Sequence, residues 1–158
     1  DTVDKEELQI KTAQEVFTPK QLKKLNSMVR KFYFNKYWLN AECDRLDFPL
    51  AMVIFDSAVN CGIKRSVRWL QRAFNEACAA DGNNGGIKED GIFGPITYNS
   101  VHQVDQSEIL TTMVAIRVEY YTGLAEQEWA EKYFHGWMRR AVSLRKYSVK
   151  QLKKLNKN

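Results

Sequence analysis

The sequence predicts a mainly α-helical protein, and three observations support this prediction. Apolar residues recur at three- and four-residue spacing over long stretches, as they do on one face of a helix. Proline stands where several of these stretches begin, a position that favours the first turn of a helix. No segment shows the strict alternation of a half-buried strand. At 158 residues, the chain is long enough for one domain with a hydrophobic core.

The most informative stretch covers residues 48–62 and reads FPLAMVIFDSAVNCG. Asp47 suits the N-cap position, and Pro49 stands near the first helical position. Almost every residue from Leu50 to Val59 is apolar, which is typical of a helix that is buried on all sides. We therefore expect a buried central helix over about residues 48–62.

Two polar residues, Asp56 and Asn60, interrupt this helix and lie on one face because they are four residues apart. Burying a carboxylate and an amide is unfavourable unless each finds partners. Either the two side chains connect the central helix to its neighbours, with Arg117 a candidate partner for Asp56, or they form the floor of a cleft.

Helices are also expected on both sides of the central stretch. Thr18 and Pro19 begin a helix that extends to about Trp38. Its aromatic end either packs in the core or forms a sugar-stacking wall at the edge of a cleft, and contains Phe32, Phe34, Tyr37 and Trp38. Later helices are predicted after Gly62, from Pro95 to about Val104, from Asp105 through Leu124, and over about residues 126–144, where Gly136 suggests a close approach of two helices.

Composition limits the possible functions. The net charge of +5 suggests an anionic partner, which could be cell wall, phospholipid or nucleic acid. His102 and His135 are too far apart for a zinc motif, so we expect no metal and no cofactor. No apolar run is long enough to span a membrane, and no signal peptide is visible. The three cysteines are expected to be reduced and buried.

Six strings in the chain, taken in order, resemble glycoside hydrolase family 108, the lysozyme-like type of secretion activators and phage endolysins. The part after Gly62 resembles the peptidoglycan-binding half of that family. The strings are Tyr37-Trp38, residues 55–62 (FDSAVNCG), 69–73 (WLQRA), 90–97 (DGIFGPIT), 117–121 (RVEYY) and 136–140 (GWMRR).

This resemblance implies a lysozyme-like helical domain in three parts. Residues 1–61 would be the remainder of the glycosidase half. Residues 62–146 would be the peptidoglycan-binding half, packed with it as one globular unit. Residues 147–158 would form a basic C-terminal tail.

The resemblance also implies hydrolysis of the glycan strand of peptidoglycan (murein), as a lysozyme or muramidase carries it out in cell-wall degradation and bacteriolysis. The catalytic glutamate of the family lies in an N-terminal Glu-Gly-Gly-Tyr string, which is missing from this chain, so no catalytic residue is assigned. The chain begins just after the place where that string would lie. Two possibilities stay open: a hydrolase seen without its catalytic N-terminal segment, or a non-catalytic peptidoglycan-binding module of the same fold.

The expected partner is bacterial peptidoglycan, and a nucleic acid ranks last because no recognition motif is present. We expect a monomer that is made in the cytoplasm of a bacterium or a phage-infected cell and acts at the cell wall or in the periplasm. The candidate glycan-binding residues are Tyr37, Trp38, Asp56, Asn60, Gln71 and Trp137.

Overall fold

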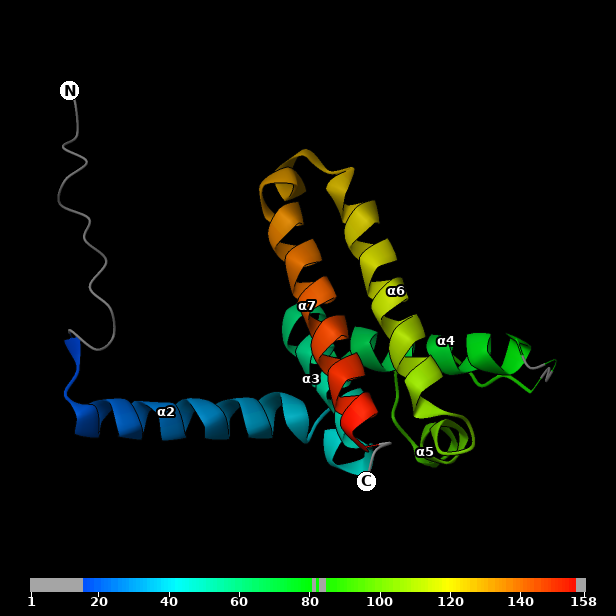
Figure 1. Cartoon of the computed structure of the whole chain (residues 1–158), viewed down its shortest axis with the longest axis horizontal. Coiled ribbons are helices and arrows are strands. Elements are labelled where there is room, and N and C mark those ends of the chain that lie inside the picture. Colours follow the sequence, from blue (N-terminus) through cyan, green and yellow to red (C-terminus); the bar gives the residue numbers. More distant parts are fainter. Residues whose placement is uncertain (1–15, 81, 83–84, 156–158) are drawn as a thin grey trace.

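The chain folds into a set of packed helices, which confirms the predicted fold class (Figure 1). This computed structural model describes residues 16–80, 82 and 85–155, and no strand occurs among them. No helix in these ranges is both long and apolar enough to cross a bilayer. The elements are α2 (Pro19–Tyr33), the π-helical turn η1 (Phe34–Trp38), the 3-10 turn η2 (Cys43–Arg45), α3 (Phe48–Cys61), α4 (Ile63–Ala80), α5 (Pro95–Val101), α6 (Gln106–Ala125), the 3-10 turn η3 (Glu128–Ala130) and α7 (Glu131–Leu155).

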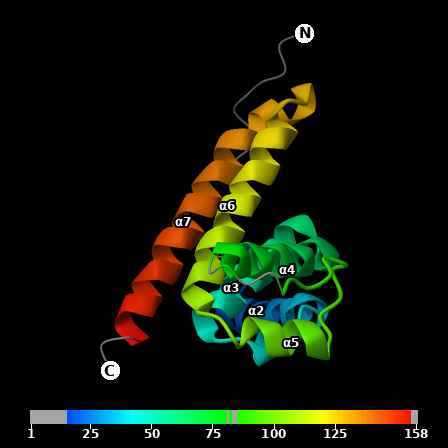
Figure 2. The same ribbon diagram turned by 90° about the vertical axis from the view of Figure 1, so that its right-hand side faces the viewer.

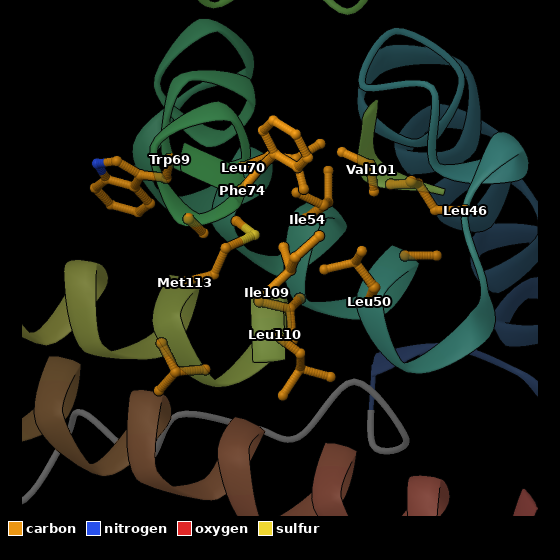
Figure 3. Close-up of a cluster of buried hydrophobic side chains, with 14 of the residues drawn as sticks. Leu46, Leu50, Ile54, Trp69, Leu70, Phe74, Val101, Ile109, Leu110 and Met113 are labelled. Carbon is orange, nitrogen blue, oxygen red and sulfur yellow. The ribbon is translucent and has the colours of Figure 1, made fainter. Parts of the chain in front are cut away.

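Helix α3 is the predicted central helix, and its inner face lies in the hydrophobic core. Leu50 and Ile54 are buried there against side chains of α4 and α6, including Leu70 and Ile109 (Figure 3). The prediction that α3 is buried on all sides is wrong, because Phe55 and its neighbour Val59 are only half-buried. The open side of α3 faces a groove that is described below.

Helices α6 and α7 lie side by side as a long hairpin whose tip extends away from α3, α4 and α5 (Figures 1 and 2). The prediction that the last helix ends near residue 144 is wrong, since α7 continues to Leu155 and includes residues 147–155 of the expected tail. The helix continues because its buried side continues past residue 144. Leu144 and Ser148 are buried, and Leu152 packs against the core. These three residues are four apart and therefore lie along one side of the helix.

Helix α2 extends outward from the other helices (Figure 1). The predicted start is confirmed, because the Thr18 hydroxyl accepts a hydrogen bond from the Gln21 backbone N–H and the Gln21 side chain accepts one from the Thr18 N–H. No residue of α2 is buried, so its apolar stripe does not enter the core. The prediction that the aromatic stretch packs in the core is confirmed only for Tyr37 and Trp38 of η1, which are partly buried against the core.

The turn before α5 is held on α4 by one buried side chain, Gln71. Its amide nitrogen donates to Asp90 Oδ1 at 3.0 Å and to the Ile92 carbonyl at 3.1 Å, and its oxygen accepts from the Gly91 N–H at 2.8 Å. The bond from Gln71 to the Asp90 carboxylate also lowers the pKa of Asp90. The turn is therefore fixed by contacts to α4 that involve both backbone and side-chain atoms.

Replacing Gly91 by alanine is expected to destabilise the protein. Gly91 has a φ of +75°, and an added Cβ would lie 2.5 Å from the carbonyl oxygen of Lys64. Backbone strain and the clash act together, so we expect a loss of about 3 kcal/mol in the free energy of unfolding. Urea unfolding measures this loss, and an unchanged midpoint would contradict the close approach.

Replacing Gly136 by alanine is expected to have the opposite effect. The predicted close helix approach at this glycine is wrong, because an added Cβ would meet no atom within 4 Å. Gly136 lies inside α7, where glycine is less favourable than alanine by about 0.5–1 kcal/mol. Gly136→Ala should therefore raise the unfolding free energy by about this amount in the same urea experiment, which makes it the control for Gly91→Ala.

Candidate functional site: a groove beside the central helix

A groove of about 460 Å³ lies between the end of α2, η1, α3 and α7. Its walls are mostly apolar and aromatic, and its charged groups are one carboxylate and two guanidinium groups. This combination suits a ligand that has both apolar faces and hydrogen-bonding groups. The lining residues are Val29, Arg30, Tyr33, Phe34, Trp38, Phe55, Asp56, Val59 and Arg140.

The aromatic wall is built where α2 passes into the π-helical turn η1. Trp38 packs against Phe55 of α3, with ring centroids 5.6 Å apart. Tyr33 stacks on Tyr37 at 5.7 Å, so Tyr37 supports a lining residue without lining the groove itself. Phe34 is 49% exposed. The wall therefore combines packed rings with rings that are open to a ligand.

Asp56 forms the charged part of the groove. One oxygen, Oδ2, accepts a hydrogen bond from Nη1 of Arg117 on α6, which confirms the predicted pair. The other, Oδ1, accepts bonds from Nη2 and Nε of Arg140 on α7 at 2.6 and 3.0 Å. Both carboxylate oxygens are therefore held by guanidinium groups, and one side chain connects three helices.

Arg117 is completely buried, unlike Arg140, which is half-exposed. Burial acts against the charge of Arg117, but the Asp56 carboxylate outweighs this effect and the pKa of Arg117 is raised. Its Nε donates to the Tyr121 hydroxyl at 3.0 Å, and that hydroxyl lies 3.5 Å from Cys61 Sγ. Burial raises the pKa of Tyr121 to about 12. Within the described residues, Nη2 of Arg117 has no hydrogen-bond partner.

The structure brings only some of the predicted glycan-binding residues to the groove. Trp38 and Asp56 line it, and Tyr37 lies behind its wall. Asn60 lies beside Asp56, where its amide donates to the Asp56 carbonyl at 2.7 Å, but it does not line the groove.

The other two predicted residues lie elsewhere. Gln71 is buried on α4, and its hydrogen bonds to the turn before α5 give it a structural role. Trp137 is stacked on Tyr121 one turn of α7 before Arg140.

Sequence reasoning did not select Tyr33 and Arg140, and it named Phe34 only as part of the aromatic stretch that packs in the core or forms a wall, although all three line the groove. A signal was present for each of them. The two aromatic residues belong to the aromatic end of the predicted first helix, and Arg140 ends the string GWMRR. Their placement depends on which face of each helix meets α3, and that information comes from the packing.

The groove is suited to binding, and its described lining does not include the carboxyl pair that glycoside hydrolysis uses. Asp56 is the single carboxylate among the described lining residues, and two arginines engage it as an acceptor. No group of three or more potential metal ligands occurs in the described part of the chain. The cysteines are free, as expected, but Cys61 is only half-buried. Burial raises the pKa of Cys43 to about 12, which makes its thiol unreactive.

Three arginines of α4, Arg65, Arg68 and Arg72, form a basic stripe, a pattern that could suggest nucleic acid, but each of them makes contacts within the protein. Arg65 donates to the Cys61 carbonyl and Arg68 to the Glu89 carbonyl. Arg72 pairs with Glu76 and Glu119. The stripe therefore gives no support to the nucleic-acid alternative.

Replacing Asp56 by alanine is expected to lower the free energy of unfolding by about 3–5 kcal/mol, because it leaves the charge of Arg117 buried without a partner. Combining it with Arg117→Met should cost less than the sum of the two single changes. Chemical denaturation measures all three variants. Glu119→Ala, which breaks an exposed pair with Arg72, is the control and should cost less than about 1 kcal/mol. Unchanged stability of Asp56→Ala would contradict the structural role of the pair.

Comparisons with known proteins agree with this architecture. A family model described as glycosyl hydrolase 108 matches residues 3–62, and one described as a predicted peptidoglycan domain matches residues 65–142. The solved structure of Brucella abortus SagA is similar, with a TM-score of 0.64 and 19% sequence identity, over 85% of this chain and 66% of that chain. At this identity the similarity shows the fold, and this chain spans just under two thirds of SagA. A search of curated proteins gave no significant match. The two matched regions follow each other in the order of the six strings, and they confirm the resemblance to glycosyl hydrolase 108 with its peptidoglycan domain.

Proposed function

We propose that this protein binds the glycan strand of bacterial peptidoglycan in the groove beside α3 and serves lysozyme-type hydrolysis of that strand. The observation that carries this proposal is the groove itself, which combines an aromatic wall with a charged floor in a chain that matches both a glycosyl hydrolase and a peptidoglycan domain. The site of action is then the cell wall or periplasm, with the chain acting as a monomer.

The chemistry of a saccharide fits the two parts of the groove. Sugar rings have apolar C–H faces that pack well on aromatic side chains such as Phe34 and Trp38. Their hydroxyl and N-acetyl groups need hydrogen-bond partners when water is removed. Arg140 is half-exposed, and its guanidinium has N–H donors beyond those that bond Asp56, so it can supply such partners.

Hydrolysis needs a proton donor that the described groove does not contain. A lysozyme-type reaction uses one carboxyl group to protonate the leaving oxygen and a second to act as base, nucleophile or stabiliser. We assign strand binding to the groove and assign proton donation to a carboxyl group outside its lining residues. In the family that this chain resembles, the donor is the glutamate of the Glu-Gly-Gly-Tyr string, which is missing here.

The alternative is a non-catalytic peptidoglycan-binding module of the same fold. Two measurements on this chain separate binding from hydrolysis. Retention on insoluble peptidoglycan tests binding, and loss of turbidity of a peptidoglycan suspension tests hydrolysis. We expect retention without loss of turbidity. Clearing by this chain alone would contradict a donor in the Glu-Gly-Gly-Tyr string, which this chain lacks, and no retention at low salt would contradict the binding function.

Replacing Phe34 by alanine is expected to weaken retention on peptidoglycan about three- to tenfold, because it removes one aromatic ring from the groove wall. Phe48 is the matched control: it is also 49% exposed but does not line the groove. Phe48→Ala should bind as the unchanged protein does. Sedimentation with purified peptidoglycan measures both, and equal retention of the two variants would remove the groove as the binding site.

A further inference from the structure

We propose that the tip of the α6–α7 hairpin carries a second saccharide-binding surface, formed by Trp129, Tyr133 and Trp137, which extends the groove along α7. This surface is called the tip platform below. The inference rests on the proposed function, because its ligand is a further part of the same glycan strand.

The tip platform exposes large aromatic rings in a fixed arrangement. Trp129 is 56% exposed and Tyr133 is 47% exposed. Trp137 lies between them, stacked on Tyr133 at 5.8 Å with an interplanar angle of 23° and in edge contact with Trp129 at 6.1 Å. Exposed aromatic rings that are already clustered mark an interaction site. Because the rings support one another, little side-chain freedom is lost when a ligand binds.

The platform is also fixed from below. The other partner of Trp137 is Tyr121, at 5.3 Å and 20°. Tyr121 is buried, and its hydroxyl accepts the hydrogen bond from Arg117 that was described above. The exposed rings are therefore connected, through two packed side chains, to the charged cluster under the groove.

Polar groups border the platform at its Trp129 end. An open hollow of about 910 Å³ lies beside Trp129. It is also lined by Gln127, Glu128, Glu131, Lys132 and His135, which supply donors and acceptors of both charges. A mixed rim of this kind disfavours a polyanion, which would need mostly cations. It suits uncharged hydroxyl and N-acetyl groups, with the ring faces stacked on the aromatic side chains.

The position of the platform continues the groove. Tyr133, Trp137 and Arg140 are spaced i, i+4, i+7 and therefore lie along one side of α7. Seven residues of helix span about 10.5 Å. Arg140 lines the groove, so the platform begins beside the groove end. From there α7 leads back to the tip of the hairpin (Figures 1 and 2). A strand in the groove would pass over these rings. All platform residues belong to the region matched by the peptidoglycan domain.

The test uses the full chain and glycan strands freed of stem peptides, of two sugars and of at least eight sugars. We expect Trp129→Ala and Tyr133→Ala each to weaken binding of the long strands about tenfold in calorimetry and to leave disaccharide binding unchanged. Trp129→Phe keeps a ring and should retain most of the affinity. Tyr147→Ala is the matched control, because Tyr147 is a 42% exposed tyrosine of α7 that lies outside the platform and should have no effect.

The outcomes separate this inference from the proposed function. Long strands that bind equally to the unchanged protein and to both alanine variants would overturn the platform, while the groove would stand. Failure of the unchanged protein to bind either strand length would overturn both proposals. A Trp129→Phe variant as weak as Trp129→Ala would overturn ring stacking as the mode of binding. Self-association that Trp129→Ala abolishes, measured by light scattering, would assign the rings to a protein interface and overturn the saccharide assignment.

Discussion

The buried charge of Arg117 is the constraint on which the rest of the structure depends. A guanidinium group without solvent contact needs an opposite charge, and Asp56 supplies it from the central helix. Because Asp56 also accepts hydrogen bonds from Arg140, the position of α7 against α3 is fixed by the same carboxylate. The groove floor and the stacked rings of α7 both follow from this arrangement, since Arg140 and Trp137 lie on neighbouring turns of one helix.

The groove lies across the two regions that the family comparisons recognise. Its aromatic wall and Asp56 belong to the part that matches glycosyl hydrolase 108, whereas Arg140 belongs to the part that matches the peptidoglycan domain. Arg117, which neutralises Asp56 from below, also belongs to the second part. The groove is therefore a property of the packed pair of regions, and neither region contains its complete lining.

The sequence allowed the central helix, the helix caps and the Asp56–Arg117 pair to be predicted, because each depends on local spacing or on one strong requirement for charge neutralisation. It did not reveal the length of α7, because the buried side of its last turns contains Ser148, and this polar residue interrupts the apolar repeat. It also did not show the role of Gln71, whose partners lie about twenty residues along the chain. The open side of α3 was missed for a related reason: apolar composition shows that a side chain avoids water but does not identify its neighbour.

The sharing of one carboxylate between the two regions limits how this architecture can be recombined. A recombination event at Gly62, between the two matched regions, would replace the second region and keep Asp56 in the first. If the new second region has no arginine equivalent to Arg117, the Asp56 carboxylate lies against an apolar helix without an opposite charge. If the second region of this chain is joined to a first region without an acid equivalent to Asp56, its buried guanidinium has no opposite charge. Two proteins of this architecture can therefore exchange these regions only when both contain residues equivalent to Asp56 and Arg117.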